Sequence, residues 1–205
     1  MKKKKNSKIW QTKRNKDFYF KESKIQGYRS RSAFKLMEMN NKFKILKKGS
    51  KILDLGSSPG GWSQVASKII DKGKILAIDI RPMQEIKNVD FINGDFFDEE
   101  IYKKINDYFK NKADVVLSDM AANTTGNKDM DSFRTGELCM KSMDLAKKIL
   151  VTDGVFLSKI FMGNIFSEIN DKANKYFKKV IKHKPLSSKK ESKEIYIYCK
   201  GVLKI

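Results

Sequence analysis

The sequence predicts an α/β fold in which a mostly parallel, seven-stranded sheet is flanked by helices. Short apolar runs of strand length alternate along the chain with longer segments in which apolar residues recur at helical spacing. Strands that alternate with helices of about ten residues or more form βαβ units, so most of the strands should run parallel. The chain has 205 residues, of which 40% are hydrophobic, which is enough for one domain with a buried core.

The elements follow in order along the chain. Five apolar runs in the central part predict strands over residues 51–56, 74–80, 89–95, 113–119 and 154–161. Helical spacing predicts helices over residues 29–46, 62–70, 99–109, 133–150 and 164–177. Two late strands are expected over residues 179–184 and 194–202, with only a loop between them. A connection without a helix indicates that one of these two runs antiparallel at the edge of the sheet.

The first 28 residues differ in composition from the rest of the chain. They are polar, rich in lysine and without hydrophobic period, so we expect residues 1–28 to be a flexible basic arm and residues 29–205 to be the folded domain. Trp10, Phe18, Tyr19 and Phe20 are interleaved with the cations. Such aromatic rings can stack on bases or can anchor the arm to the domain, and the sequence leaves both open.

The charge is unevenly distributed. The chain carries 44 Lys and Arg against 24 Asp and Glu, a net charge of +20. Residues 1–50 hold 17 basic and 3 acidic side chains, residues 178–205 hold 9 and 2, and the middle holds 18 and 19. Lysine makes up 39 of the basic residues, as an AT-rich genome would produce, but uniform bias would not leave the centre neutral. The pattern favours a polyanionic partner, with nucleic acid first.

Several classes of protein are excluded. No apolar run reaches the roughly 18 residues of a membrane-spanning helix, and no apolar segment follows the basic start, as a secretion signal requires. Cys139 and Cys199 lie far apart, which makes a disulfide framework or a cysteine zinc site improbable and fits a reducing compartment. We therefore expect a cytoplasmic protein, and by default a monomer.

A glycine loop, Asp54-Leu-Gly-Ser-Ser-Pro-Gly-Gly-Trp62, follows the first strand and opens a helix. Gly56 and Gly61 have the spacing of a nucleotide triphosphate loop, but Trp62 stands where that motif requires lysine. Ser58 occupies the middle glycine of the dinucleotide motif. The loop lies at the carboxyl edge of the sheet, where such folds bind ligands, and it favours a ligand without phosphate.

Acidic residues recur at the ends of the next strands. Asp79 lies 23 residues after Gly56, near the offset at which an acid binds the hydroxyl pair of a ribose, and Asp95 could accept from an adenine amino group. One acid alone would be an ordinary surface residue of a βα turn. Together with the glycine loop, the two acids predict a nucleoside pocket without pyrophosphate, which suits S-adenosylmethionine.

Two polar residues interrupt or end apolar strands. Lys159 lies inside an apolar run, where a lysine is costly unless it is paired or functional, and Asp119 ends the preceding strand. Lys35 and Glu194, taken alone, would be an ordinary helix lysine and an edge-strand carboxylate. His183, the one histidine, is interpreted as structural or surface.

These segments resemble the FtsJ/RrmJ (RlmE) family of ribosomal RNA 2′-O-ribose methyltransferases over residues 28–202. One departure is Ala122, which stands where the family usually has proline. The resemblance is carried by five segments in this order: Tyr28–Leu36, Leu53–Gln64, Ser118–Asn123, Leu157–Phe161 and Ser192–Tyr196.

The resemblance implies a Rossmann-like, S-adenosylmethionine-dependent methyltransferase fold and a set of site residues. The family's catalytic tetrad falls on Lys35, Asp119, Lys159 and Glu194. Cofactor contacts fall on the glycine loop and the strand-end acids: Gly56, Gly60, Gly61, Trp62, Asp79, Asp95 and Asp119. RNA phosphates would be bound by basic residues at both ends of the domain: Arg29, Arg31, Lys189, Lys190 and Lys193.

The implied reaction is in-line methyl transfer to the 2′-oxygen of a uridine in 23S ribosomal RNA of the large subunit. Lys159 would accept the hydroxyl proton, Glu194 would position Lys35 or the ribose, and no metal is expected. Two alternatives stay open: a transfer RNA or cap ribose methyltransferase of the same family, and a non-catalytic RNA-binding factor of ribosome assembly.

Overall fold

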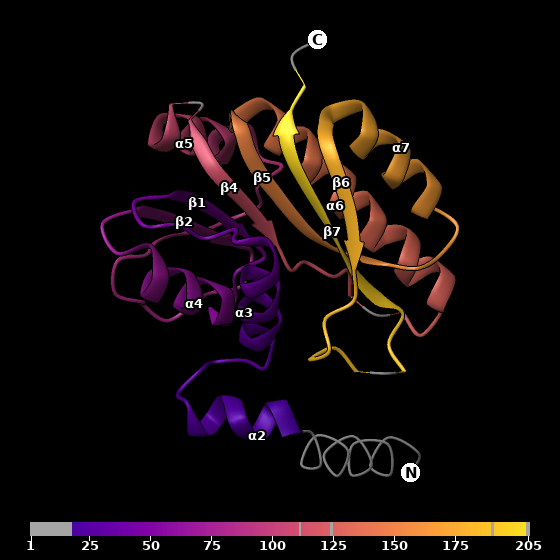
Figure 1. Cartoon of the computed structure of the whole chain (residues 1–205), viewed down its shortest axis with the longest axis horizontal. Helices are drawn as coiled ribbons and strands as arrows, with labels where there is room; N and C mark the ends of the chain where they lie inside the picture. The colour runs from indigo at the N-terminus through magenta and orange to yellow at the C-terminus, as the bar shows by residue number, and fades with distance from the viewer. Residues whose placement is uncertain (1–17, 111, 124, 190, 204–205) are drawn as a thin grey trace.

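A computed structural model describes residues 18–110, 112–123, 125–189 and 191–203. Within these residues the chain forms one seven-stranded sheet in the order β3-β2-β1-β4-β5-β7-β6 (Figure 1). The predicted fold class is confirmed. The strands are β1 (Lys51–Leu55), β2 (Lys74–Asp79), β3 (Asp90–Asn93), β4 (Ala113–Ser118), β5 (Leu150–Phe161), β6 (Phe177–His183) and β7 (Glu194–Val202).

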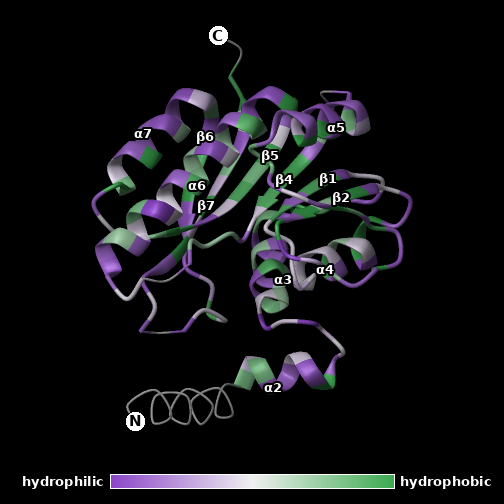
Figure 2. Ribbon diagram, turned by 180° about the vertical axis from the view of Figure 1, so that it is seen from behind, coloured by the Kyte–Doolittle hydropathy of each residue, from purple (hydrophilic) through white to green (hydrophobic). Residues whose placement is uncertain are grey.

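Helices cover both faces of the sheet (Figures 1 and 2). On one face, α3 (Ser32–Phe43) and α4 (Gly61–Ile70) bury their apolar sides against the strands. On the other face lie α5 (Glu99–Phe109), α6 (Lys128–Ile149) and α7 (Phe166–Tyr176). Hydrophobic residues are concentrated in the strands, and the helices carry hydrophobic and hydrophilic residues in alternation (Figure 2). The sheet thus separates two hydrophobic cores, and its carboxyl edge stays open for a site.

The antiparallel strand is inside the sheet, not at its edge. β7 pairs antiparallel with β5 on one side and with β6 on the other, so the predicted edge position was wrong. Because β7 runs opposite to β5, its first residue lies at the carboxyl edge, where Glu194 is paired with Phe161. This reversal brings the start of β7 to the ends of β1, β4 and β5.

Two helices differ most from the sequence prediction. Residues Phe18–Ile25 form α2, where no helix was expected, and the Tyr19 ring contacts the Phe34 ring of α3 at 5.4 Å between centroids. Trp10 and the rest of residues 1–17 lie outside the described part of the chain. Helix α6 begins five residues earlier than predicted, because the Asn127 side chain accepts hydrogen bonds from the amides of Asp129 and Met130 and caps it.

Two expectations from composition can be compared with the described residues. None of their helices is long and apolar enough to cross a membrane. Cys139 and Cys199 are both buried and both free thiols.

Candidate active site

A cavity of about 520 Å³ opens at the carboxyl edge of the sheet. Its volume lies within the range of pockets that enclose small ligands. Residues in or just after five neighbouring strands, β1 to β5, line it together with the glycine loop, among them Gly56, Trp62, Asp79, Asp119 and Lys159. Asp95 also lines the cavity. The structure thus brings the predicted cofactor acids and the predicted catalytic lysine to one hollow.

Gly56 is the glycine that the backbone requires. Its φ is +71°, and a Cβ built there would lie 2.3 Å from Cγ of Met120. A side chain at this position would therefore be strained and would also collide with the loop after β4. Gly60 and Gly61 are not among the lining residues, because they pack against the side chains of Arg29 and Ser30. Their role is to let the loop approach the segment before α3.

Asp79 organises the glycine loop while it faces the cavity. Its carboxylate accepts hydrogen bonds from the amide of Ser58 at 2.9 Å and from the amide of Arg81 at 2.8 Å. Asp95 is half-buried and accepts from the amide of Phe97 at 3.0 Å. Each carboxylate oxygen has two lone pairs, so both acids keep acceptor capacity for ligand hydroxyl or amino groups.

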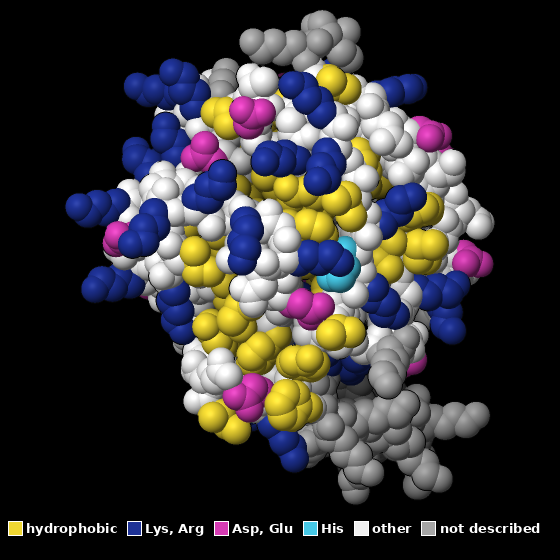
Figure 3. All heavy atoms as spheres, in the orientation of Figure 1, with side chains coloured by type: hydrophobic (Ala, Val, Ile, Leu, Met, Phe, Trp, Pro, Cys, Tyr) yellow, Lys and Arg dark blue, Asp and Glu magenta, His cyan; other side chains and the backbone are white. Residues whose placement is uncertain are grey.

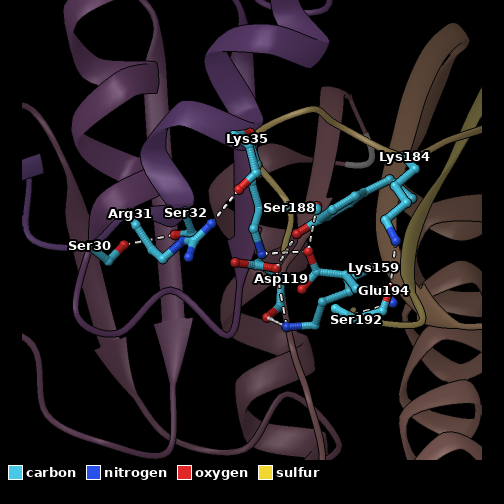
Figure 4. Close-up of polar contacts among 12 residues, drawn as sticks. Ser30, Arg31, Ser32, Lys35, Asp119, Lys159, Lys184, Ser188, Ser192 and Glu194 are labelled. Carbon is cyan, nitrogen blue, oxygen red and sulfur yellow. Dashed lines mark hydrogen bonds and ion pairs between the residues drawn. The ribbon is translucent and has the colours of Figure 1, made fainter. Parts of the chain in front are cut away.

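The four predicted tetrad residues meet at the edge of this cavity (Figure 4). Lys159 Nζ lies 3.2 Å from Oδ1 of Asp119 and donates to the Asp119 backbone carbonyl at 2.6 Å. Lys35 Nζ lies 2.6 Å from Oε1 of Glu194. Both lysines are over 90% buried, so their ammonium groups need these partners. Segments far apart in the sequence supply one member each: α3, the residue that follows β4, β5 and β7.

The charge state of Asp119 follows from its neighbours. Burial alone would raise the pKa of its carboxyl group, but the Lys159 and Lys35 cations and the Tyr196 hydroxyl lower it below its ordinary value. The carboxylate is therefore ionised at neutral pH and can orient the Lys159 amine.

Two residues of the site were not predicted from the sequence. Tyr196 is fully buried and its hydroxyl donates to Oδ1 of Asp119 at 2.8 Å. Ser188 donates from Oγ to Oε1 of Glu194 at 2.8 Å, the same oxygen that pairs with Lys35. In sequence, Tyr196 is one more apolar strand residue and Ser188 one more loop serine. Only the alternation of β7, which puts Glu194, Tyr196 and Tyr198 on one face, was available as a signal.

The residues predicted to contact RNA differ in their surroundings: two arginines contact backbone carbonyls, and two lysines are exposed. The guanidinium group of Arg29 donates to the backbone carbonyls of Pro59, Gln84 and Glu85, at 3.2, 2.7 and 2.7 Å. This geometry makes Arg29 a support of the glycine loop. Arg31 contacts the carbonyl of Ser187. Lys189 and Lys193 are exposed on the loop between β6 and β7, and Lys190 lies outside the described residues.

The cavity wall is rich in carboxylates. Four acidic side chains line it, Asp54, Asp79, Asp95 and Asp119, against the two basic side chains of Arg81 and Lys159. Two buried polar atoms, Oδ1 of Asp54 and Oγ of Ser57, have no hydrogen-bond partner within the described protein. A cationic ligand with several polar groups, such as S-adenosylmethionine, fits this wall and these atoms. Among the described residues no group of three or more His, Cys, Asp or Glu is placed to hold a metal.

Asp54 gives a testable pH dependence of stability. Burial raises the pKa of its carboxyl group to about 7, although Ser63 donates a hydrogen bond to it at 2.6 Å. The pKa of the Asp54 carboxyl group is higher in the folded protein than its unfolded value of about 3.9. The protonated carboxyl group therefore contributes its full stabilisation below about pH 3.9, and this contribution is lost as pH rises through about 7. The Asp54→Asn variant should lack this loss. Between pH 4 and pH 8, the free energy of unfolding of the wild type should fall relative to that of the variant by on the order of 3 kcal/mol.

Urea unfolding of both proteins across this pH range measures the difference, with exposed Asp153→Asn as the control. Parallel pH profiles for the wild type and Asp54→Asn would show that the buried carboxyl group does not titrate in this window.

Comparisons with known proteins identify the family of the chain. The model of the FtsJ-like methyltransferase family matches residues 28–202. A protein of Pelagibacter ubique named ribosomal RNA large subunit methyltransferase E is 51% identical over 98% of both chains. A protein of the same name from Rickettsia bellii is 42% identical, over 94% of this chain and 87% of its own.

Solved structures show the same fold. The crystal structure of a candidate ribosomal RNA methyltransferase from Plasmodium falciparum is 32% identical, covers 86% of this chain and 99% of its own, and superposes with a TM-score of 0.76. A candidate methyltransferase from Streptococcus mutans, crystallised with SAH (S-adenosylhomocysteine), covers 80% of this chain and 96% of its own. It has a TM-score of 0.54 and 14% identity, so it shows the fold alone.

Proposed function

The chain belongs to the FtsJ-like methyltransferase family, and on that premise we propose that it methylates the ribose 2′-hydroxyl of a uridine in 23S ribosomal RNA of the large subunit. The family depends on S-adenosylmethionine as the methyl donor. Relatives named for the large-subunit RNA match nearly the whole chain, which supports ribosomal RNA as the substrate. We propose no metal, because the reaction develops no phosphoryl charge that a metal would neutralise.

One observation carries the proposal: a buried lysine, paired with a carboxylate, lines the same cavity as the cofactor acids. Lys159 and Asp119 line it together with Asp79 and Asp95. A hydroxyl group that is methylated must lose its proton, and an amine beside the pocket can accept it. A protein that only binds RNA would not need an internal ion pair there.

When bound, S-adenosylmethionine supplies an electrophilic methyl group on its sulfonium. Lys159 first gives up its ammonium proton to solvent. Its Nζ then accepts the proton of the ribose 2′-hydroxyl and becomes an ammonium ion again. The backbone carbonyl and carboxylate of Asp119 orient that amine and then stabilise the cation. Glu194 holds Lys35 close to the site, and the hydroxyl of Tyr196 fixes Asp119. Much of the rate comes from holding the reacting atoms in line.

We propose that binding of RNA is shared between the domain, residues 29–205, and the basic segment of residues 1–28. The net charge of +20 supports this proposal, and many Lys and Arg side chains lie on the face of the molecule that carries α3, β6 and β7 (Figure 3). The proposed phosphate contacts are Arg29, Arg31, Lys189 and Lys193, together with Lys190, which lies outside the described residues. Binding should weaken steeply with salt. We also propose that the protein is a monomer and that it acts in the cytoplasm, where its substrate is found.

The test is transfer of labelled methyl from S-adenosylmethionine to large ribosomal subunits, free large-subunit RNA and bulk transfer RNA, side by side. Nuclease digestion then identifies the labelled nucleotide. Label in a 2′-O-methyluridine of the subunit RNA is the expected result.

The alternatives give different outcomes in the same experiment. Label in transfer RNA alone would move the protein to a sister activity of the same chemistry. No transfer to any RNA, together with tight binding of subunits, would favour a non-catalytic assembly factor.

A further inference from the structure

Leu186 lies in the loop between β6 and β7 and is 86% exposed, the highest value among the large exposed hydrophobic side chains of the described residues. Its neighbours Pro185, Ser187 and Ser188 are buried. A single exposed leucine on a mobile loop would need no explanation. Leu186 differs from such a residue because the backbone of its loop is fixed by hydrogen bonds.

The backbone of the loop is fixed to α3. Glu38 accepts hydrogen bonds from the amide of Leu186 at 2.7 Å and from the amide and hydroxyl of Ser187, both at 3.1 Å. Arg31, two turns earlier on the same side of the helix, contacts the carbonyl of Ser187. A carboxylate and a guanidinium group therefore hold two consecutive residues from both sides, and the leucine side chain is presented on a rigid base.

The held loop is part of the tetrad's surroundings. Ser188, two residues after Leu186, donates to Glu194 at 2.8 Å, and Glu194 pairs with Lys35 (Figure 4). Two residues of chain span at most about 7 Å. Leu186 therefore lies at the rim of the site, and the same loop carries the exposed Lys189 and Lys193.

The proton acceptor is too deep for a stacked nucleotide. Lys159 is 8% exposed and Lys35 9% exposed. The 2′-hydroxyl of a nucleotide stacked inside a structured RNA cannot approach an amine at that depth unless the nucleotide leaves its stack. Enzymes that act on nucleotides inside folded nucleic acids extrude the target and bear the cost of unstacking. Apolar side chains such as leucine can hold open the step from which a base departs.

We propose that Leu186 is a nucleobase contact that packs against the base next to the target and holds the target nucleotide out of its stack. The proposal rests on the proposed function, because it assumes that RNA is the substrate. An apolar, rigidly held side chain suits this task, since it offers surface to a base face and loses little conformational entropy on contact.

The experiment compares two RNA substrates of one sequence, a hairpin that stacks the target uridine and an unstructured strand. Single-turnover methylation gives the ratio of the rate constants on hairpin and strand. Leu186→Ala should lower this ratio about 10-fold or more, because the unstructured strand has no stack to open. Leu186→Met should restore most of it. Exposed Glu191→Ala, in the same loop, is the control and should leave the ratio unchanged.

A second readout does not depend on turnover. A hairpin with 2-aminopurine beside the target uridine, bound with S-adenosylhomocysteine, should gain fluorescence with the wild type and not with Leu186→Ala. If Leu186→Ala slows both RNAs equally and leaves the fluorescence gain intact, the proposal is overturned. If the wild type methylates neither RNA yet raises the fluorescence and the variant does not, the contact stands and the proposed reaction fails.

Discussion

Replacing Lys159 with methionine should lower the rate constant of methyl transfer by about 1,000-fold or more. General base catalysis contributes about 100- to 10,000-fold, and methionine fills the lysine volume without an amine. The affinity for S-adenosylmethionine should change by less than about threefold, because the glycine loop and Asp79 are untouched. Single-turnover transfer of labelled methyl to large-subunit RNA, with calorimetry for the cofactor, measures both quantities.

The Lys159→Arg variant separates two roles of the lysine. Arginine keeps the positive charge beside Asp119 but does not give up its proton in proteins. If Lys159 accepts the hydroxyl proton, arginine should be nearly as inactive as methionine. If activity survives in Lys159→Arg, the residue acts only through its charge, and the assignment of the proton acceptor must be abandoned.

Replacing Asp79 with alanine should weaken the binding of S-adenosylmethionine about 100-fold. The carboxylate is proposed to accept hydrogen bonds from the ribose hydroxyls, and hydrogen bonds to a charged group contribute about 1.5 to 3 kcal/mol each. It also holds the amides of Ser58 and Arg81, so its loss loosens the glycine loop as well. Calorimetric titration of the cofactor into each protein gives the dissociation constants.

Asp95→Ala is the matched control for Asp79→Ala. Asp95 lies two residues after the neighbouring strand β3, and among the described contacts its carboxylate holds only the Phe97 amide, so its loss should weaken binding of the cofactor only about 10-fold. At saturating cofactor, Asp79→Ala should methylate RNA at close to the wild-type rate. Unchanged cofactor affinity in Asp79→Ala would remove the ribose contact from the proposed pocket.

The sheet was predictable because its strands are continuous apolar runs, which parallel strands buried on both faces require. The predicted bounds of four strands agree with the structure to within one residue: β1, β2, β4 and β7. The predicted bounds of α5 agree with the structure at both ends. The position of β7 was not predictable, since strand order depends on pairing between distant segments. Helix α2 was missed because it lacks hydrophobic periodicity and is stabilised by packing such as Tyr19 against Phe34.

The site divides in the same way. Lys159 could be singled out because a lysine in an apolar strand breaks a local rule. Lys35 and Glu194 break none, and only the family resemblance identified them, because 159 residues separate the two ends of their ion pair. The contact of Arg29 with RNA stays a prediction, and its guanidinium group also donates to three backbone carbonyls.

The insertion of β7 between β5 and β6 has a consequence for the order of biosynthesis. A nascent chain that has emerged only as far as β6 contains the acids of the cavity, but it lacks Glu194 and Tyr196. Its tetrad is completed only when β7 has been translated and has paired with β5 and β6. If ribosomal RNA is the substrate, the growing chain is thereby kept inert toward the ribosome that synthesises it, and it becomes competent only after this last docking step.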